Sequence, residues 1–151
     1  MVSIRRAQPS DAGEVLTVQR AAFVTEAQLH DDVHMAPLTQ TLDEVRATIA
    51  ATTVLVATDG PRIVGAVRAL AAGDAWHIGR LVVVPDLQGR GIGTELLREI
   101  ERLAPPDLDR FTVETGPKSE PNIHLYERHG YRQVPNDTIL IRLTKQREPV
   151  S

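Results

Sequence analysis

The stretch from Trp76 to Leu103 constrains the fold of this chain more than any other part of the sequence. Within it, the apolar and β-branched run from Ile78 to Val84 predicts a buried strand. Pro85 ends that strand, because proline has no amide hydrogen to donate to a sheet. Apolar residues then recur with helical spacing: Ile92, Leu96, Leu97, Ile100 and Leu103. The stretch therefore predicts a strand–turn–helix unit that buries one face of its helix.

The turn of this unit carries three glycines at alternate positions, Gly89, Gly91 and Gly93. Its backbone has little side-chain cover, so its N–H groups can approach a ligand closely. The first amides of the next helix have no partner within the helix, and Arg90 adds a positive charge beside them. Residues 88–94 therefore predict a site for phosphate oxygens. An ordinary left-handed turn leading into a core helix is the simpler alternative.

Two other phosphate-binding motifs fit this turn poorly. A dinucleotide fingerprint requires G-x-G-x-x-G, whereas the third glycine here comes one residue early and is followed by Thr94. A P-loop requires Gly-Lys-Ser or Gly-Lys-Thr, and the sequence contains neither.

Composition excludes several classes of protein. A length of 151 residues is that of one domain with a real core, and 17 Lys+Arg against 20 Asp+Glu argue against a nucleic-acid partner. The absence of cysteine excludes thiol catalysis, disulfides and cysteine-based zinc sites. No segment has the apolar length of a signal peptide or a membrane span. We therefore expect a cytoplasmic protein without a membrane partner.

The remaining sequence predicts an alternation of strands and helices. Strands are expected at residues 2–7, 53–58, 62–70, 110–114, 131–134 and 138–144, and further helices at residues 11–23, 42–50 and 119–129. Ser10 is the expected N-cap of the first helix, and the capping-box spacing of Thr41 and Glu44 marks the second. Residues 1–144 are expected to form one domain, and residues 145–151 a polar tail.

Two motifs, in this order of elements, resemble those of a known family. QxxGxG at residues 88–93, after a strand that reads LVVxP at residues 81–85, is similar to the acetyl-CoA-binding motif of the Gcn5-related N-acetyltransferase (GNAT) superfamily. LYERHGY at residues 125–131 resembles the family's LYxxxGF segment. The resemblance covers nearly the whole chain and implies an α/β (α+β) GNAT fold. That fold has a mixed, mostly antiparallel twisted sheet of about seven strands, splayed at the central strand, with about four helices.

The resemblance implies an acetyl-CoA-dependent N-acyltransferase that acetylates a primary amine of a small molecule or peptide by direct attack in a ternary complex. A bulged central strand and the glycine turn would bind coenzyme A, and the Leu81 amide would stabilise the oxyanion. The residues expected to bind the cofactor are Leu81, Val82, Val83, Gln88, Gly89, Arg90, Gly91, Ile92, Gly93, Thr94 and Asn122. The alternative is a non-catalytic acyl-CoA-binding regulatory module with the same fold.

The chain departs from the family's pattern near its last helix. An asparagine often stands seven residues before the tyrosine, where this chain has Ser119, and a small residue often stands where this chain has Asn122. Either side chain could contact the pantetheine. The longer reach of Asn122, with both a donor and an acceptor, favours Asn122.

Three side chains are candidates for proton transfer. Tyr126 is the expected general acid, since a phenol with a pKa of about 10 can protonate a thiolate yet stay protonated at rest. The resemblance places His77 where the histone-acetylating branch has a glutamate, and a histidine of pKa near 6.5 is neutral enough to act as a base. Glu114, on the neighbouring strand, is the alternative base. The simpler roles are core packing for Tyr126 and partial exposure on a strand for His77.

Residues 25–40 are expected to be irregular and, from the resemblance, to close over the acceptor. Three acidic groups in this segment suit a cationic amine: Glu26, Asp31 and Asp32. His30 and His34 have i, i+4 spacing, but the sequence places no third ligand, so no metal is predicted. The sequence leaves open the acceptor and whether the protein is a monomer or a homodimer.

Overall fold

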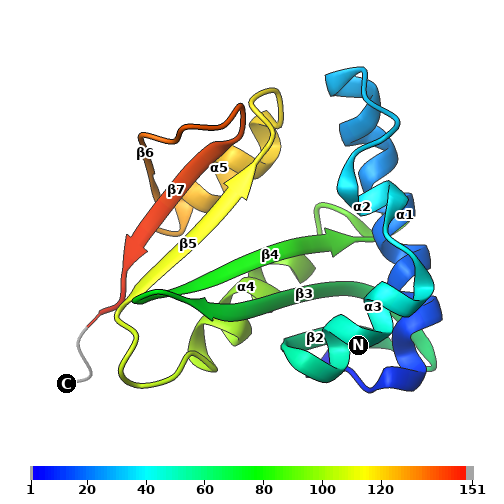
Figure 1. Cartoon of the computed structure of the whole chain (residues 1–151). Coiled ribbons are helices and arrows are strands. Elements are labelled where there is room, and N and C mark those ends of the chain that lie inside the picture. Colours follow the sequence, from blue (N-terminus) through cyan, green and yellow to red (C-terminus); the bar gives the residue numbers. More distant parts are fainter. Residues whose placement is uncertain (1, 149–151) are drawn as a thin grey trace.

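The computed structural model describes residues 2–148 and contains one seven-stranded sheet (Figure 1). The strands are β1 (Val2–Arg6), β2 (Thr53–Asp59), β3 (Arg62–Ala72), β4 (Ala75–Val83), β5 (Arg110–Thr115), β6 (Arg132–Val134) and β7 (Ile141–Gln146). Their order in the sheet is β1-β2-β3-β4-β5-β7-β6. Every neighbouring pair is antiparallel except β4 and β5, which run parallel. The mixed, mostly antiparallel sheet expected from the sequence is confirmed.

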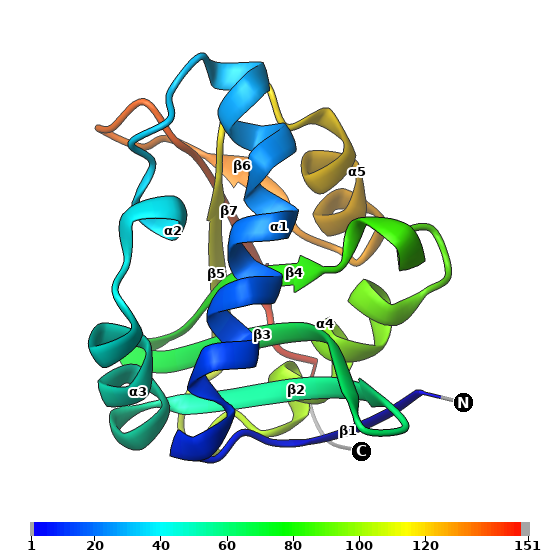
Figure 2. The ribbon, with the colours of Figure 1, turned by 90° about the vertical axis from the view of Figure 1, so that its right-hand side faces the viewer.

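Helices cover both faces of this sheet. They are α1 (Ala12–His30), α2 (Ala36–Thr39), α3 (Leu42–Ala51), α4 (Ile92–Arg102) and α5 (Glu120–Arg128), with the short 3-10 helices η1 (Pro9–Asp11) and η2 (Pro85–Leu87). In Figures 1 and 2, α1 and α3 lie on one face of the first strands and α4 lies on the other. Residues 2–148 therefore contain one short α-helix, α2, in addition to the four α-helices that were expected.

The core fills both interfaces between sheet and helices. The apolar stripe of α4 is fully buried at Leu96, Leu97 and Ile100, and the burial of each such side chain stabilises the fold by roughly 1.5–3 kcal/mol. Trp76 adds a polar anchor, because its indole Nε1 donates to the carbonyl of Ile100 over 2.9 Å. The central strand and its following helix are thus joined by packing and by one buried hydrogen bond.

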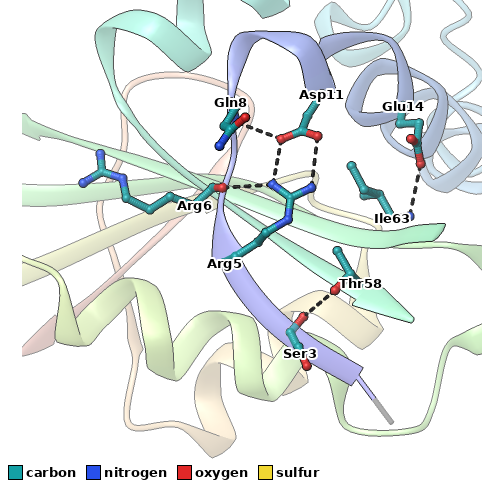
Figure 3. A network of polar contacts seen from close by, with 8 residues as sticks. All are labelled: Ser3, Arg5, Arg6, Gln8, Asp11, Glu14, Thr58 and Ile63. Carbon is teal, nitrogen blue, oxygen red and sulfur yellow. Dashed lines mark hydrogen bonds and ion pairs between the residues drawn. The ribbon is translucent and has the colours of Figure 1, made fainter. Parts of the chain in front are cut away.

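A polar network fixes the junction between β1 and the first helices (Figure 3). Both terminal nitrogens of Arg5 donate to the carboxylate of Asp11, at 2.8 and 3.0 Å, and the backbone N–H of Gln8 donates to it at 2.7 Å. Asp11, not Ser10, occupies the N-cap position of α1, because the chain first makes the 3-10 turn η1. One turn later, Glu14 accepts from the backbone N–H of Ile63 at 3.1 Å, which ties α1 to β3.

The expectation that residues 25–40 are irregular was wrong. Helix α1 continues to His30, and α2 forms within the same segment. Asp31 then ends α1 in a left-handed conformation with φ of 48°, and the N–H of Asp32 donates to the Ala27 carbonyl at 3.0 Å. The helix persists because its last turns remain in contact with the protein: Ala27 is buried.

The boundary predicted for the C-terminal tail lies inside a strand. β7 continues to Gln146, which pairs with Arg110 of β5. Arg147 then donates to the carbonyls of Pro105 and Leu108, at 2.8 and 3.0 Å, and lies over the ring of Phe111. Residues 149–151 of the predicted tail lie outside the described residues.

The sheet opens between β4 and β5, and this opening positions the site (Figure 1). The two strands pair only from Ala75 with Arg110 to Ile78 with Val113, although β4 continues for five further residues. On its other side, β4 has one residue more than β3 between two paired positions, which makes a bulge around Arg80. Arg80 has a φ of 51°, a left-handed conformation that turns β4 away from β5.

Within residues 2–148, no helix is both long and apolar enough to cross a membrane.

Candidate functional site

Two cavities meet at the opening of the sheet. The first has a volume of about 620 Å³ and the second a volume of about 500 Å³. They share four lining residues, from α1, β4 and α5: Phe23, Glu26, Leu81 and Asn122. A ligand that runs along the first cavity can therefore present its end to the second. We call them the donor groove and the acceptor cavity.

The donor groove contains most of the residues expected to bind a cofactor. They are Leu81, Val82, Val83, Gln88, Gly89, Gly91, Ile92, Gly93, Thr94 and Asn122. Arg90 does not line the groove, although it belongs to the same turn. Of the two residues considered for pantetheine, Asn122 lines the groove, whereas Ser119 is fully buried. The fold therefore brings ten of the eleven residues expected to bind the cofactor together in one groove.

The glycine turn forms the end of the donor groove next to α4. Gly89 and Gly91 have φ values of 80° and 83°, and Gly91 caps α4 without any side-chain hydrogen bond. The first helical bond here is from the N–H of Glu95 to the carbonyl of Gly91. None of the backbone N–H groups of residues 88–94 donates to another described residue. These amides and the positive end of α4 form a site that suits an anion.

The opened edge of β4 forms the long wall of the groove. Val84 donates through its N–H to the carbonyl of Val64, so alternation turns the backbone groups of Val83 away from β3. The Val83 carbonyl accepts instead from the side chain of Gln88 at 3.2 Å. Two residues earlier, Leu81 lies where β5 has already diverged. This edge therefore offers main-chain hydrogen-bonding groups to a ligand along the groove.

A carboxylate bridges the two helices that flank the opening. Glu26 of α1 accepts a hydrogen bond from the hydroxyl of Ser119 and one from the side-chain amide of Asn122, the latter at 3.4 Å. The carbonyl of Glu26 also lies 2.8 Å from Nδ1 of His30, and Nε2 of His30 accepts from the N–H of Lys118 at 3.1 Å. The sequence predicts Glu26 among the acidic groups of the segment that closes over the acceptor. It carries no signal of this bridge, because the partners of Glu26 lie more than ninety positions away.

The acceptor cavity brings together all three candidates for proton transfer. His77 of β4, Glu114 of β5 and Tyr126 of α5 line it. His77 Nδ1 lies 2.8 Å from the hydroxyl of Thr112, and its Nε2 lies 3.9 Å from the Glu114 carboxylate. The bulge at Arg80 interrupts the regular alternation of side chains along β4, yet His77 and Leu81 both line this cavity.

The environment of His77 keeps its imidazole neutral. Burial lowers its pKa below 6.5, and the positive charge of Arg142 lowers the pKa further, while the Glu114 carboxylate opposes them. Arg142 lies 3.6 Å from the other oxygen of Glu114, and Asn136 donates to that same oxygen at 3.1 Å. Glu114 is therefore occupied by two partners, whereas His77 retains a neutral ring that can accept a proton.

Tyr126 is buried between the cavity and the core. Burial raises the pKa of its phenol well above 10, and the nearby Glu26 carboxylate raises it further. Its ring makes an edge-to-face contact with Tyr131 at 5.6 Å between centroids. Among the described residues, no group accepts a hydrogen bond from the Tyr126 hydroxyl. The phenol is thus fully protonated and is available to a ligand in the cavity.

Two arginines of the acceptor cavity were missed by sequence reasoning. Arg68 of β3 and Arg80 of β4 line it together with residues of α2. Arg80 follows Gly79 within an apolar run, and only the bulge directs it to this cavity, so the sequence carried no signal of its position. Among residues 2–148, no cluster of three or more His, Cys, Asp or Glu has the arrangement of a metal site.

Comparisons with known proteins agree with this fold. Residues 50–133 match the model of the Acetyltransferase (GNAT) domain. The PaiA N-acetyltransferase of Thermoplasma acidophilum, solved with coenzyme A, is 14% identical over 97% of this chain and 99% of its own, with a TM-score of 0.81. YncA of Salmonella typhimurium, solved with acetyl-CoA, is 18% identical over 100% of this chain and 96% of its own, with a TM-score of 0.77. The GNAT domain of the S. lividans protein PAT is 20% identical over 96% of this chain and 90% of its own, with a TM-score of 0.78. Among curated proteins, none matches this chain.

Proposed function

Because this chain belongs to the GNAT family of acetyltransferases, we propose that it transfers an acetyl group from acetyl-CoA to the primary amine of a small molecule or peptide. The amine attacks directly, with both substrates bound at once. The observation that carries this proposal is the junction of the donor groove and the acceptor cavity at Leu81 and Asn122. A thioester at that junction would be open to an amine from the second cavity.

The donor groove fits coenzyme A in its polar groups. Unbonded amides of residues 88–94, at the start of α4, suit the pyrophosphate. The free edge of β4 at Leu81 and Val83 suits the amides of the pantetheine arm, and Asn122 can add a side-chain contact. Arg90 remains close enough in the chain to attract the phosphates, although it does not line the groove. The known complexes of PaiA with coenzyme A and of YncA with acetyl-CoA support this assignment.

Acetyl-CoA, when bound, supplies a thioester whose carbonyl carbon the amine attacks. His77 takes a proton from the acceptor ammonium, directly or through a water, so that the neutral amine can attack; its ring is neutral and lines the acceptor cavity. The N–H of Leu81 donates a hydrogen bond to the developing oxyanion. Tyr126 gives its phenolic proton to the departing thiolate. Glu114 is the weaker base, since Arg142 and Asn136 already hold its carboxylate.

Two measurements on the full chain test this function. The first is the thermal shift with acetyl-CoA, and the second is the release of free thiol with a panel of primary amines. We expect stabilisation by acetyl-CoA and thiol release with at least one amine. Binding without thiol release from any amine would favour a non-catalytic acyl-CoA-binding module. No stabilisation by acetyl-CoA would refute the donor groove.

The two candidate bases are separated by His77→Gln and Glu114→Gln. We expect the histidine variant to lose turnover by about 10²–10⁴-fold, the usual contribution of a general base, and the glutamate variant to retain most of it. If both variants kept wild-type turnover at every pH, the proton would leave to solvent instead.

A further inference from the structure

Two guanidinium groups without an ion-pair partner among residues 2–148 line the acceptor cavity, those of Arg68 and Arg80. Nη1 of Arg80 is buried and has no hydrogen-bond partner among the described residues. Arg68 has one weak contact, in which Nη1 donates to Oε1 of Gln40 over 3.5 Å, and that oxygen already accepts from Gln19 at 3.1 Å. Neither arginine forms an ion pair with a described carboxylate.

No acidic group of residues 2–148 raises the pKa of either arginine. Burial lowers the pKa of Arg80 to about 10, and repulsion from Arg68 adds to this effect. For Arg68, burial alone lowers the pKa, and no acidic neighbour raises it. By contrast, the exposed Arg5 and Arg62 have raised pKa values, because each pairs with an aspartate. Buried charges without partners destabilise a fold, so their presence indicates a ligand that compensates them.

The same cavity also carries the opposite charge. Glu26, Asp32 and Glu114 line it, beside the neutral His77 and the Tyr126 phenol. The cavity therefore combines two guanidinium groups, from β3 and β4, with three carboxylates, from α1, the segment after α1 and β5. A volume of about 500 Å³ is ample for a molecule the size of an amino acid.

We propose that the acetyl acceptor is an amino acid, whose carboxylate binds between Arg68 and Arg80 while its amine faces His77 and Glu114. This inference rests on the acetyltransferase function proposed above and specifies its substrate class. A planar guanidinium binds a carboxylate through two parallel hydrogen bonds, and no described acidic group competes for that of Arg80. The bond formed is the amide between the amino nitrogen and the acetyl carbon, the bond broken is the thioester, and the ammonium proton leaves through His77.

Matched acceptors test the carboxylate directly. The panel contains α- and ω-amino acids, the amide of each, and the corresponding decarboxylated amines. We expect the best acceptor to be an amino acid, with a kcat/KM at least about tenfold above that of its amide, since the amide loses a charge-assisted hydrogen bond. If the amide or the decarboxylated amine is acetylated as well as the acid, the proposal fails while the acetyltransferase function stands.

Arg80→Gln tests the arginine itself. We expect this variant to reduce the preference for acid over amide, measured as the ratio of their kcat/KM values, to less than about threefold. The control is Arg46→Gln, which removes a half-exposed guanidinium from α3, and it should preserve the preference. An unchanged preference in Arg80→Gln would overturn the assignment.

Binding and stability give a readout that does not need turnover. Among the amino acids of the panel, at least one should raise the Tm of wild type with acetyl-CoA present, and should raise that of Arg80→Gln much less. In the free protein, Arg80→Met should melt at or above the wild-type temperature, because it removes an uncompensated buried charge. A clear loss of Tm in Arg80→Met would mean that Arg80 serves the fold, and would contradict the proposal. If no amine releases thiol, the proposed function fails, and the Tm shifts still decide whether Arg80 binds a carboxylate.

Discussion

The side-chain amide of Asn122 donates to the carboxylate of Glu26 across 3.4 Å, which joins α5 to α1 over the opening of the sheet. The fully buried hydroxyl of Ser119 donates to the same carboxylate. Figure 1 shows the C-terminal half of α1 and α5 on opposite sides of that opening. Glu26 therefore sets the spacing of the walls between which both cavities lie.

Removal of the Glu26 carboxylate should destabilise the protein. Glu26→Ala leaves the buried Ser119 hydroxyl without its acceptor, and we expect a loss of about 1–3 kcal/mol in the free energy of unfolding. Glu26→Gln keeps one carbonyl oxygen and should lose less. Urea denaturation measures both. In the background of Ser119→Ala, the effect of Glu26→Ala should shrink by the energy of that hydrogen bond; a purely additive double mutant would contradict the bridge.

The two tyrosines of the core should separate catalysis from stability. Tyr126→Phe removes a hydroxyl that bonds to no described residue and should reduce kcat by about 10²-fold or more, with the unfolding free energy within about 0.5 kcal/mol of wild type. Tyr131→Phe is the matched control, since its hydroxyl donates to Glu101 at 2.6 Å away from both cavities. It should retain kcat and lose about 1.5–3 kcal/mol of stability. The reverse pattern would assign Tyr126 to packing alone.

The pH dependence of kcat/KM should report the environment of His77. A base acts when deprotonated, and burial lowers the pKa of His77 below 6.5, so activity should persist below that pH and fall as the pH drops through the lowered pKa. Glu114→Gln removes a charge that raises this pKa and should move the acid limb to lower pH. Arg142→Gln removes a charge that lowers the pKa and should move the limb to higher pH. His77→Gln should lose the limb, and an acid limb that neither charge variant moves would belong to another group.

A charge placed at the glycine turn should prevent coenzyme binding. Gly91 and Gly73 both have positive φ values, 83° and 61°, and a Cβ at either would meet no atom within 4 Å. Substitution should therefore cost each about 1 kcal/mol through backbone strain alone. Gly91→Glu also puts a carboxylate at the predicted phosphate site and should weaken coenzyme A by more than about 100-fold in calorimetry, or about 2.7 kcal/mol. Gly73→Glu, in the distant turn between β3 and β4, should change the affinity less than twofold. Equal affinities for the two variants would refute the phosphate site.

Local patterns predicted the elements of this fold well, because their signals lie within short stretches of chain. The capping box at Thr41 fixes the start of α3, the apolar stripe after Gly91 fixes α4, and the run before Pro85 fixes β4. Local patterns failed to predict where an element ends when contacts with distant parts of the chain determine that end. Helix α1 persists to His30 because its end packs on the protein, and β7 reaches Gln146 because β5 pairs with it.

The sequence by itself determined the strand–turn–helix unit, the family motifs and the residues of the donor groove, since consecutive residues of one unit form most of that groove. Only the tertiary structure decided the acceptor cavity. The early end of pairing at Ile78 and the bulge at Arg80 depend on two neighbouring strands. In the folded chain, His77, Glu114 and Tyr126 line one cavity with Arg68 and Arg80. These groups come from separate elements, so the spacing of residues along the chain does not predict the distances between them. The charges that would bind an acceptor come together only in the folded protein.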